Sequence, residues 1–252
     1  MQAEERQQTI LQMLQTRGQL AIADLSARFE VSEMTVRRDL AQLEKTGLLR
    51  RIHGGAARAG SGSFEPPFAL RARLHTEAKR AIATAVAAEL TDGQTVILDG
   101  GTTGMAVAEA LVGRNLTVCA LNMRVAEILA SSPATRVMLP GGVIRHDELS
   151  LAGAAAERTL ADHRFDTYVM TVSGIDTAAG LTEWNLDDAA VKRAALAVAG
   201  RCVVACDSSK FGQTAFARIA ALGDVDVIIT DTALAADQRE AAAAGGADVR
   251  IA

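Results

Sequence analysis

Residues 31–40 constrain the fold of this chain more than any other stretch. Ser32 is a favourable N-cap, because its hydroxyl can accept a hydrogen bond from a free amide of the first helical turn. Val36, Leu40 and Leu43 follow at the spacing of one apolar helical stripe. The residues on the opposite face, at about 100° per residue, are Met34, Arg38, Ala41 and Lys45. The stretch therefore predicts a helix with one buried face and one exposed, basic face.

Two further helical patterns precede this one. Residues 4–16 carry apolar side chains at helical spacing, and Gly18 ends the pattern. Residues 21–29 form a second predicted helix, and residues 30–32 turn the chain into the third. Two helices joined by so short a turn, with basic side chains on the outer face of the second, are typical of a helix-turn-helix that binds DNA.

A strand and a glycine turn follow the third helix. Residues 48–55 predict this strand and turn, which would supply the wing of a winged helix. Between Arg37 and Arg58 there are six Lys and Arg against two acids, whereas the residues after 58 carry 17 Lys and Arg against 23 Asp and Glu. Positive charge thus gathers where DNA phosphates would lie, although the whole chain has a net charge of −4. The predicted DNA contacts are Ser32, Met34, Thr35, Arg37, Arg38, Arg50, Arg51, His53 and Gly54.

Composition argues against several other classes of protein. No apolar run approaches the roughly 20 residues of a membrane span, and the first residues lack the basic start and apolar core of a signal peptide. Three cysteines lie inside apolar segments, which favours a reducing compartment over a disulfide framework. The four histidines are scattered, without the spacing of metal ligands. We expect a cytoplasmic protein with no cofactor, no metal site and no membrane partner.

The second half of the chain has a different pattern. Residues 59–63 are rich in glycine and serine, and two prolines follow them, so this stretch predicts a linker. From residue 76 onward, short apolar strands alternate with helices, which is typical of a mostly parallel sheet covered on both faces. The predicted fold class is therefore α/β, with a winged helix-turn-helix domain at 1–58, a linker at 59–75 and a larger domain at 76–252.

The loop Asp99-Gly100-Gly101-Thr102-Thr103-Gly104 is the most distinctive strand end of the larger domain. In parallel sheets ligands bind at the carboxyl ends of the strands. Glycines let backbone amides approach an anion, threonine hydroxyls add donors, and a helix N-terminus adds a positive dipole end. Such a turn can also be purely structural. Other polar residues follow strands at the same predicted edge, however, and the set suits a small phosphorylated polyol.

These residues resemble the DeoR family of bacterial transcriptional regulators. Residues 31–40 and the run Arg51-Ile52-His53-Gly54-Gly55-Ala56 match the N-terminal domain of that family, and the order of loops after residue 76 matches its sensor domain. The resemblance implies a sensor similar in fold to ribose-5-phosphate isomerase, with no catalytic residues. It implies a homo-oligomer, dimer or tetramer, that binds double-stranded operator DNA, most often as a repressor relieved by a phosphorylated sugar or polyol. The effector contacts that it implies are Asp99, Gly101, Thr102, Thr103, Asn122, Gly141, Gly142, Gly174, Asp176, Glu183, Lys192 and Lys210.

Three residues depart from the usual pattern of the family. Gly100 and Gly104 replace a serine and a threonine of the loop, and Leu121 replaces a threonine before the asparagine. The backbone donors and two threonines remain, so the phosphate site should persist while ligand preference changes. The stretch 173–176, with Glu183 before an aromatic residue, resembles family members that sense glycerol 3-phosphate.

A second interpretation is a sugar-phosphate isomerase-like enzyme fused to a DNA-binding head. The implied fold allows it, although a fold does not determine a function. Isomerisation requires a general base positioned near the substrate carbon. Asp99, Asp176 and Glu183 are all candidates, and the sequence does not select one of them.

Overall fold

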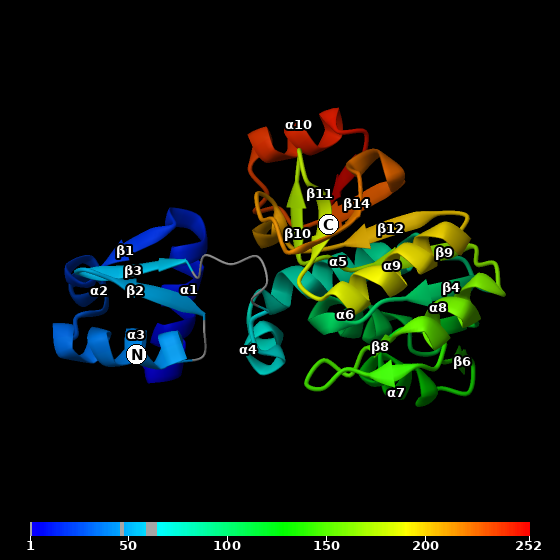
Figure 1. The fold of residues 1–252 in the computed structure, drawn as a ribbon, viewed down its shortest axis with the longest axis horizontal. Helices are drawn as coiled ribbons and strands as arrows, with labels where there is room; N and C mark the ends of the chain where they lie inside the picture. Colours follow the sequence, from blue (N-terminus) through cyan, green and yellow to red (C-terminus); the bar gives the residue numbers. More distant parts are fainter. Residues whose placement is uncertain (1, 46–47, 59–64) are drawn as a thin grey trace. The chain divides into compact units, whose positions relative to one another are not determined.

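The computed structural model describes residues 2–45, 48–58 and 65–252, and the chain divides into two compact units, Met1–Leu74 and His75–Ala252 (Figure 1). Each unit has a hydrophobic core of its own. Residues 59–64 of the predicted linker lie outside the described residues. The remainder of that stretch contains the short helix α4 (Phe68–Arg73).

The first unit is a winged helix. Its strands form an antiparallel sheet of order β1-β3-β2. The predicted helices and the wing are confirmed, whereas β1 was not predicted, because three residues with a single buried side chain give no recognisable alternation. The elements are α1 (Ala3–Arg17), β1 (Gln19–Ala21), α2 (Ile22–Phe29), α3 (Glu33–Lys45), β2 (Leu49–Ile52) and β3 (Gly55–Arg58).

Helix α3 has the two faces that its sequence predicts. The Ser32 hydroxyl accepts a hydrogen bond from the Thr35 amide at 3.2 Å and so caps the helix. Val36 and Leu40 are fully buried, whereas 74% of Met34 is exposed. Met34 lies in the first turn of α3, and a single exposed apolar side chain of this kind is common on protein surfaces.

Asp39 lies on the buried side of α3. Its carboxylate is buried and accepts hydrogen bonds from Arg6 Nε at 2.5 Å and Gln7 Nε2 at 3.2 Å. This buried ion pair ties α1 to α3. Because Arg6 neutralises Asp39 inside the unit, Asp39 does not offset the arginines on the exposed face of α3.

The second unit is built on a seven-stranded sheet of order β15-β14-β12-β9-β4-β5-β6, in which every neighbouring pair is parallel. The predicted parallel sheet is therefore confirmed. Its strands are β4 (Thr95–Leu98), β5 (Thr117–Ala120), β6 (Arg136–Met138), β9 (Thr167–Met170), β12 (Cys202–Ala205), β14 (Val227–Thr230) and β15 (Asp248–Ile251). Its helices are α5 (Thr76–Ala88), α6 (Gly101–Leu111), α7 (Met123–Ala130), α8 (Ala154–Ala161), α9 (Leu186–Val198) and α10 (Ala236–Ala244).

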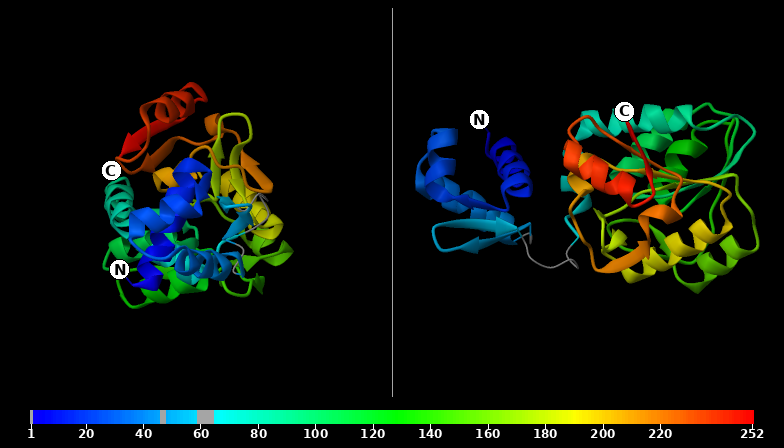
Figure 2. Two further views of the ribbon diagram at one scale, coloured as in Figure 1. Left: turned by 90° about the vertical axis from the view of Figure 1, so that its left-hand side faces the viewer. Right: turned by 90° about the horizontal axis from the view of Figure 1, so that it is seen from above.

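Helices cover both faces of this sheet, so its strands are apolar on both sides. Val96 and Leu98 pack with residues of α5, α6 and α7 in one core. Ile97 and Tyr168 point the other way and pack with residues of α8 and α9. In the right-hand view of Figure 2, α5 (cyan-green) and α9 (yellow) accordingly lie on opposite sides of the sheet.

Two small antiparallel sheets were not predicted. One has the order β10-β11-β13 and packs on the core beside α9; the other is the hairpin β7-β8. Their strands lack the continuous apolar run that marks the strands of the parallel sheet, because β7 and β8 have only two residues each and β10 and β11 begin with glycine and end in an acid. They are β7 (Val143–Ile144), β8 (Leu151–Ala152), β10 (Gly174–Asp176), β11 (Gly180–Glu183) and β13 (Ala217–Ala220).

We predict that Asp39→Ala destabilises the first unit by about 3 kcal/mol or more, because removing one partner leaves a buried guanidinium without its counter-charge. Hydrogen–deuterium exchange of the full chain should show lost protection in α1 and α3. Glu33→Ala is the matched control: that carboxylate is exposed and meets Arg37 at 3.3 Å, so its loss should change stability by less than about 0.5 kcal/mol. Equal protection in Asp39→Ala and the wild type would contradict the prediction.

Candidate functional site

The order of the strands selects one point on the sheet as the natural ligand site. From β4 the chain moves outward through β5 and β6, then returns to β9 on the other side of β4 and continues through β12, β14 and β15. Ligands of open parallel sheets bind beyond the strand ends where the order reverses in this way. Here that point lies between Asp99, which follows β4, and Thr171, which follows β9.

A buried lysine from α9 occupies this point. Lys192 Nζ lies 2.9 Å from Asp99 Oδ2 and 2.6 Å from Glu183 Oε2, and it donates to the Thr171 carbonyl at 2.8 Å. Each of the three groups that carry charge is at most 8% exposed. An ammonium has three donors, and these three contacts use all of them. The structure thus brings together three predicted effector residues, Asp99, Glu183 and Lys192.

The charges of this centre hold one another in the ionised state. Burial alone would lower the pKa of Lys192, but Asp99 and Glu183 raise it well above its ordinary value. Burial likewise opposes ionisation of Glu183, yet Lys192 and hydrogen bonds from Ser173 and the Trp184 amide lower the pKa of that carboxyl. Two carboxylates and one ammonium leave the centre with a net charge of −1.

The first turn of α6 presents unpaired donors beside this centre. The helix begins at Gly101, inside the glycine-rich loop. No side chain among the described residues caps it, and within the same part of the chain the amides of Gly101, Thr102 and Thr103 have no partner. Asp99 instead accepts the Gly100 amide at 2.7 Å and the Thr171 amide at 3.0 Å. Helix amides and threonine hydroxyls in this arrangement suit an anion.

The two unusual glycines of the loop are required by close packing. A Cβ atom at Gly100 would lie 2.7 Å from Asn122 Nδ2, and one at Gly104 would lie 2.3 Å from the Asp99 carbonyl oxygen. The first turn of α6 therefore sits closer to Asn122 and Asp99 than larger side chains would allow.

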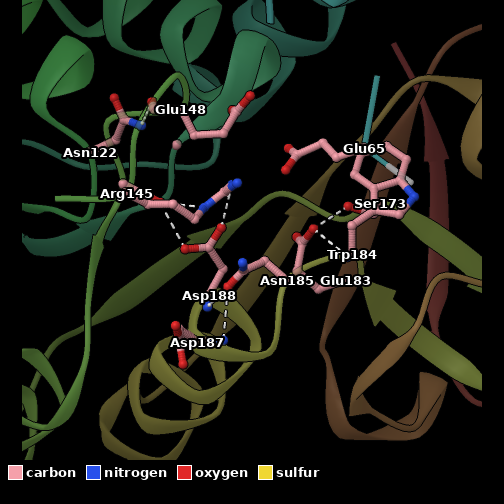
Figure 3. A network of polar contacts seen from close by, with 12 residues as sticks. Glu65, Asn122, Arg145, Glu148, Ser173, Glu183, Trp184, Asn185, Asp187 and Asp188 are labelled. Carbon is pink, nitrogen blue, oxygen red and sulfur yellow. Dashed lines mark hydrogen bonds and ion pairs between the residues drawn. The ribbon is translucent and has the colours of Figure 1, made fainter. Parts of the chain in front are cut away.

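A second layer of polar residues surrounds Asn122 (Figure 3). The Asn122 amide caps α7 through the Arg124 backbone and donates to the Glu148 carbonyl at 2.8 Å. Arg145 lies 2.7 Å from Asp188 and donates to the Ser150 hydroxyl at 3.3 Å. Burial raises the pKa of the Asp188 carboxyl, although Arg145 opposes the change.

Sequence reasoning missed Arg145, Glu148 and Asp188. The first two belong to an irregular loop between two-residue strands, and Asp188 lies in the acidic first turn of α9. A signal was present in the Gly141-Gly142 turn, since Arg145 follows it by three residues.

Four of the predicted effector residues stand apart from the lysine centre. Asp176 Oδ1 accepts hydrogen bonds from the Ala178 and Ala179 amides in the β10-β11 turn. Asp176 pairs with Gly180, and Glu183 lies three residues further along β11, or roughly 10 Å away. Gly141 and Gly142 form the exposed turn before β7, and Gly174 opens the buried strand β10.

Lys210 lies at the other side of the site. Its ammonium is 5.1 Å from the centre of the Trp184 ring, a cation–π contact. Lys210 belongs to the short 3₁₀ turn Ser208–Lys210, which the buried Asp207 caps through the Ser209 amide at 3.1 Å. Burial opposes ionisation of Asp207, but Lys210, His75 and Lys79 lower the pKa of its carboxyl.

The predicted DNA contacts lie on two surfaces of the first unit. Arg38 is exposed on α3, and Arg37 beside it meets Glu33 at the surface. In the wing, Arg50 and His53 are exposed and Gly54 adopts a left-handed φ of 77° in the hairpin turn. Arg51 pairs with Glu44 of α3 at 2.5 Å and lowers the pKa of that half-buried carboxyl. A basic helix and a basic hairpin therefore project from one small core.

Comparison with known proteins supplies the family. The model of the DeoR-like helix-turn-helix domain matches residues 6–61, and the model of the DeoR C terminal sensor domain matches residues 74–232. The chain belongs to the DeoR family. Its members are DNA-binding transcriptional regulators, so the regulator interpretation of the sequence is confirmed at that level.

Named relatives of this DeoR-family chain extend over nearly its whole length. A putative aga operon transcriptional repressor of Escherichia coli O157:H7 is 35% identical over 97% of this chain and 92% of its own. The glycerol-3-phosphate regulon repressor of Escherichia coli strain K12 is 33% identical over 92% of both chains. Among solved structures, ribose 5 phosphate isomerase A from Neisseria gonorrhoeae matches 53% of this chain and 52% of its own, with 14% identity and a TM-score of 0.38. That likeness is partial.

Three further observations concern the described part of this family member. None of its helices is both long and apolar enough to cross a membrane. Cys119, Cys202 and Cys206 are buried and unpaired, and burial raises the pKa of Cys119 to about 12. No trio of His, Cys, Asp or Glu in the described ranges is grouped to hold a metal ion.

We predict that Lys192→Met reverses the pH dependence of stability of the second unit. At neutral pH the change leaves two buried carboxylates without a cation, at a cost of about 3–5 kcal/mol. In the wild type the pKa of Glu183 lies below its unfolded value, so stability is present above pH 4.5 and is lost as the pH falls through the folded pKa. Without Lys192, burial raises that pKa, and stability should instead increase as the pH falls.

Urea unfolding at pH 7.5, pH 4.5 and pH 3.5 measures this difference, because the wild type should keep the Glu183 contribution down to about pH 4.5 and lose it below, whereas the variant should gain stability from pH 7.5 downward. Arg193→Met is the control on the same helix, because Arg193 is exposed and donates to a backbone carbonyl. It should keep the pH dependence of the wild type. A Lys192→Met variant that loses stability on acidification as the wild type does would refute the predicted role of the ammonium.

Proposed function

We propose that this protein is a repressor of an operon for the breakdown of a carbohydrate or polyol, relieved when a phosphorylated sugar or polyol binds the second unit. The observation that carries the proposal is the uncapped first turn of α6, with Thr102 and Thr103, at the point where the strand order reverses. Its amides and hydroxyls are donors for a phosphate. A DNA-binding unit in the same chain gives such a site a regulatory use.

The chemistry of the site supports a small ligand with both a phosphate and hydroxyl groups. The α6 donors suit the phosphate, and the polar layer around Asn122 and Glu148 suits hydroxyls. The named relatives regulate an aga operon and a glycerol-3-phosphate regulon, which is consistent with a phosphorylated metabolite. Glycerol 3-phosphate is the first compound to test.

The DNA side of the proposal rests on α3 and the wing. Arg38 and Thr35 would contact base edges or phosphates in the major groove, and Arg50 and His53 would contact the backbone from the wing. We propose a homo-oligomer, dimer or tetramer, because two such heads can read two half-sites of an operator. A chromosome-binding regulator would work in the cytoplasm. The effector acts only through a difference in its affinity for DNA-competent and incompetent states.

We propose no catalytic role for the site. An isomerase needs a carboxylate that is free to take a proton from a substrate carbon. Glu183 is engaged by Lys192, Ser173 and the Trp184 amide, and these contacts lower its pKa. Asp176 is engaged by two amides in a turn. Turnover of a sugar phosphate by the purified full chain would restore the enzyme alternative.

We predict that one phosphorylated sugar or polyol weakens binding of the full chain to its own promoter DNA at least tenfold, a coupling of about 1.4 kcal/mol. Fluorescence anisotropy of labelled promoter DNA, titrated with a panel that includes glycerol 3-phosphate, measures this effect. Unphosphorylated glycerol is the control. Specific DNA binding that no phosphorylated compound changes would contradict the sensor role, and absence of specific binding would contradict the regulator role as a whole.

We predict that Arg38→Ala weakens operator binding by about 1–3 kcal/mol and relaxes base preference if the guanidinium contacts a base. A phosphate contact would instead weaken all sequences alike and reduce the salt slope by about 1. Anisotropy at several salt concentrations, on operator and scrambled DNA, separates these outcomes. Arg164→Ala, an exposed arginine of the second unit, is the charge-matched control. Unchanged affinity in Arg38→Ala would exclude α3 as the reading helix.

A further inference from the structure

We propose that Arg145 is the cation that binds the anionic group of the effector, and that Asp188 positions the guanidinium and competes with the effector for it. The inference rests on the proposed function, because it assigns the charge of the ligand to one residue of that site. Neither residue was among the effector contacts that the sequence predicted.

The need for another cation follows from the charges of the lysine centre. All three donors of Lys192 are engaged by Asp99, Glu183 and the Thr171 carbonyl. With two carboxylates around one ammonium, the centre would repel an anion at short range. Lys210 lies over the Trp184 ring. A phosphate on the α6 turn would therefore be stabilised by a further positive charge from another part of the site.

Contacts lead from the α6 turn to Arg145. The Asn122 side chain packs against Gly100, where a Cβ atom would be 2.7 Å from Asn122 Nδ2. Asn122 also forms a β-bridge with Ser150, and the Ser150 hydroxyl accepts from Arg145 Nε at 3.3 Å. Figure 3 shows the Arg145 side chain between Asn122 and Asp188, on the same side of the site.

The guanidinium is held from two sides and remains accessible. Asp188 Oδ2 lies 2.7 Å from Arg145 Nη2, while Asp188 Oδ1 accepts from the Ser150 hydroxyl at 2.8 Å. The Arg145 side chain is 23% exposed, compared with 7% for Lys192. A guanidinium presents five donors in a planar fork that matches phosphate, so an anionic group of the effector would share this fork with the Asp188 carboxylate and compete with it.

The backbone of the loop keeps Arg145 in this position. Asp147 and Leu149 adopt left-handed φ angles of 65° and 59°, which cost energy unless other contacts fix them. Arg124 supplies such contacts, since it donates to the Asp147 carbonyl at 2.8 Å and the Glu148 carbonyl at 2.6 Å. These contacts therefore fix the backbone of the loop that carries Arg145.

The test is calorimetric titration of the full chain with glycerol 3-phosphate and with inorganic phosphate, for wild type and variants of matched charge. Arg145→Gln should weaken both about tenfold or more, as expected for loss of a charge-assisted contact. Asp188→Asn should tighten both, by about threefold or more, because it removes the competing carboxylate. Asp187→Asn, on the exposed neighbour, and Arg136→Gln, at the amino end of the sheet, should leave affinity within about twofold of wild type.

Opposite signs for the two variants distinguish binding from structural support. If Asp188 only held the loop together, Asp188→Asn would weaken binding as Arg145→Gln does, and this result would overturn the competition. Wild-type affinity in Arg145→Gln would overturn the assignment of the cation. Arg145→Lys keeps the positive charge without the planar fork, so its affinity for both probes should lie between that of the wild type and that of Arg145→Gln. Thermal melts check that every variant folds. If the wild type binds neither probe, and no compound of the wider panel changes its affinity for DNA, the proposed function itself is refuted.

Discussion

The second unit depends on one buried ammonium. Lys192 joins the end of β4, through Asp99, to β11, through Glu183, and to the carbonyl that follows β9. A lone charge at this depth would be strongly unfavourable, and the same holds for either carboxylate. The ion pairs between the Lys192 ammonium and the two carboxylates offset the cost of burying all three groups. The centre therefore fixes the relative position of the parallel sheet and the small antiparallel sheet at the place where a ligand would bind.

Helix α9 connects this centre to the outer wall of the site. Asp188 and Lys192 are one turn apart, so they project from the same side of the helix. Lys192 reaches the strand ends, and Asp188 reaches the loop that carries Arg145. The Asn185 side chain caps the start of the helix by accepting the Asp187 and Asp188 amides. The capped first turns of α9 thus set the spacing between the Lys192 centre and the Arg145–Asp188 ion pair.

The sequence was sufficient for the elements with strong periodicity. The stripe of Val36, Leu40 and Leu43 and the Ser32 cap predict α3, and apolar strands such as β4 predict the parallel sheet. The β7-β8 hairpin and the β10-β11-β13 sheet were missed because their strands are either only two residues long or interrupted by glycine and polar side chains, so no continuous apolar run marks them. The ion pair between Arg6 and Asp39 was not predicted either, because the two residues lie 33 positions apart and no local pattern shows such a pairing.

The site was predictable to a similar degree. Sequence motifs predicted Asp99, Glu183 and Lys192 as effector residues, and the structure brings them together. Their ion pairs could not be predicted, because the three residues are far apart in the sequence. Motif order alone gave Lys192 the same standing as Lys210, although one is saturated by buried acceptors and the other lies over an aromatic ring. Arg145 sits in an irregular loop whose shape comes from contacts with α7 and α9. A residue of that kind is visible only once the distant elements are placed.

The position of Trp184 has a consequence for observing the molecule. It is the single tryptophan of the chain, its amide donates to the Glu183 carboxylate, and the Lys210 ammonium lies over its ring. Indole emission responds to nearby charge, so a change in either neighbour alters the light that this side chain emits. The protein thus carries an intrinsic optical label within its candidate ligand site. Ligand entry could be followed in unmodified protein in real time, with no other tryptophan to obscure the signal.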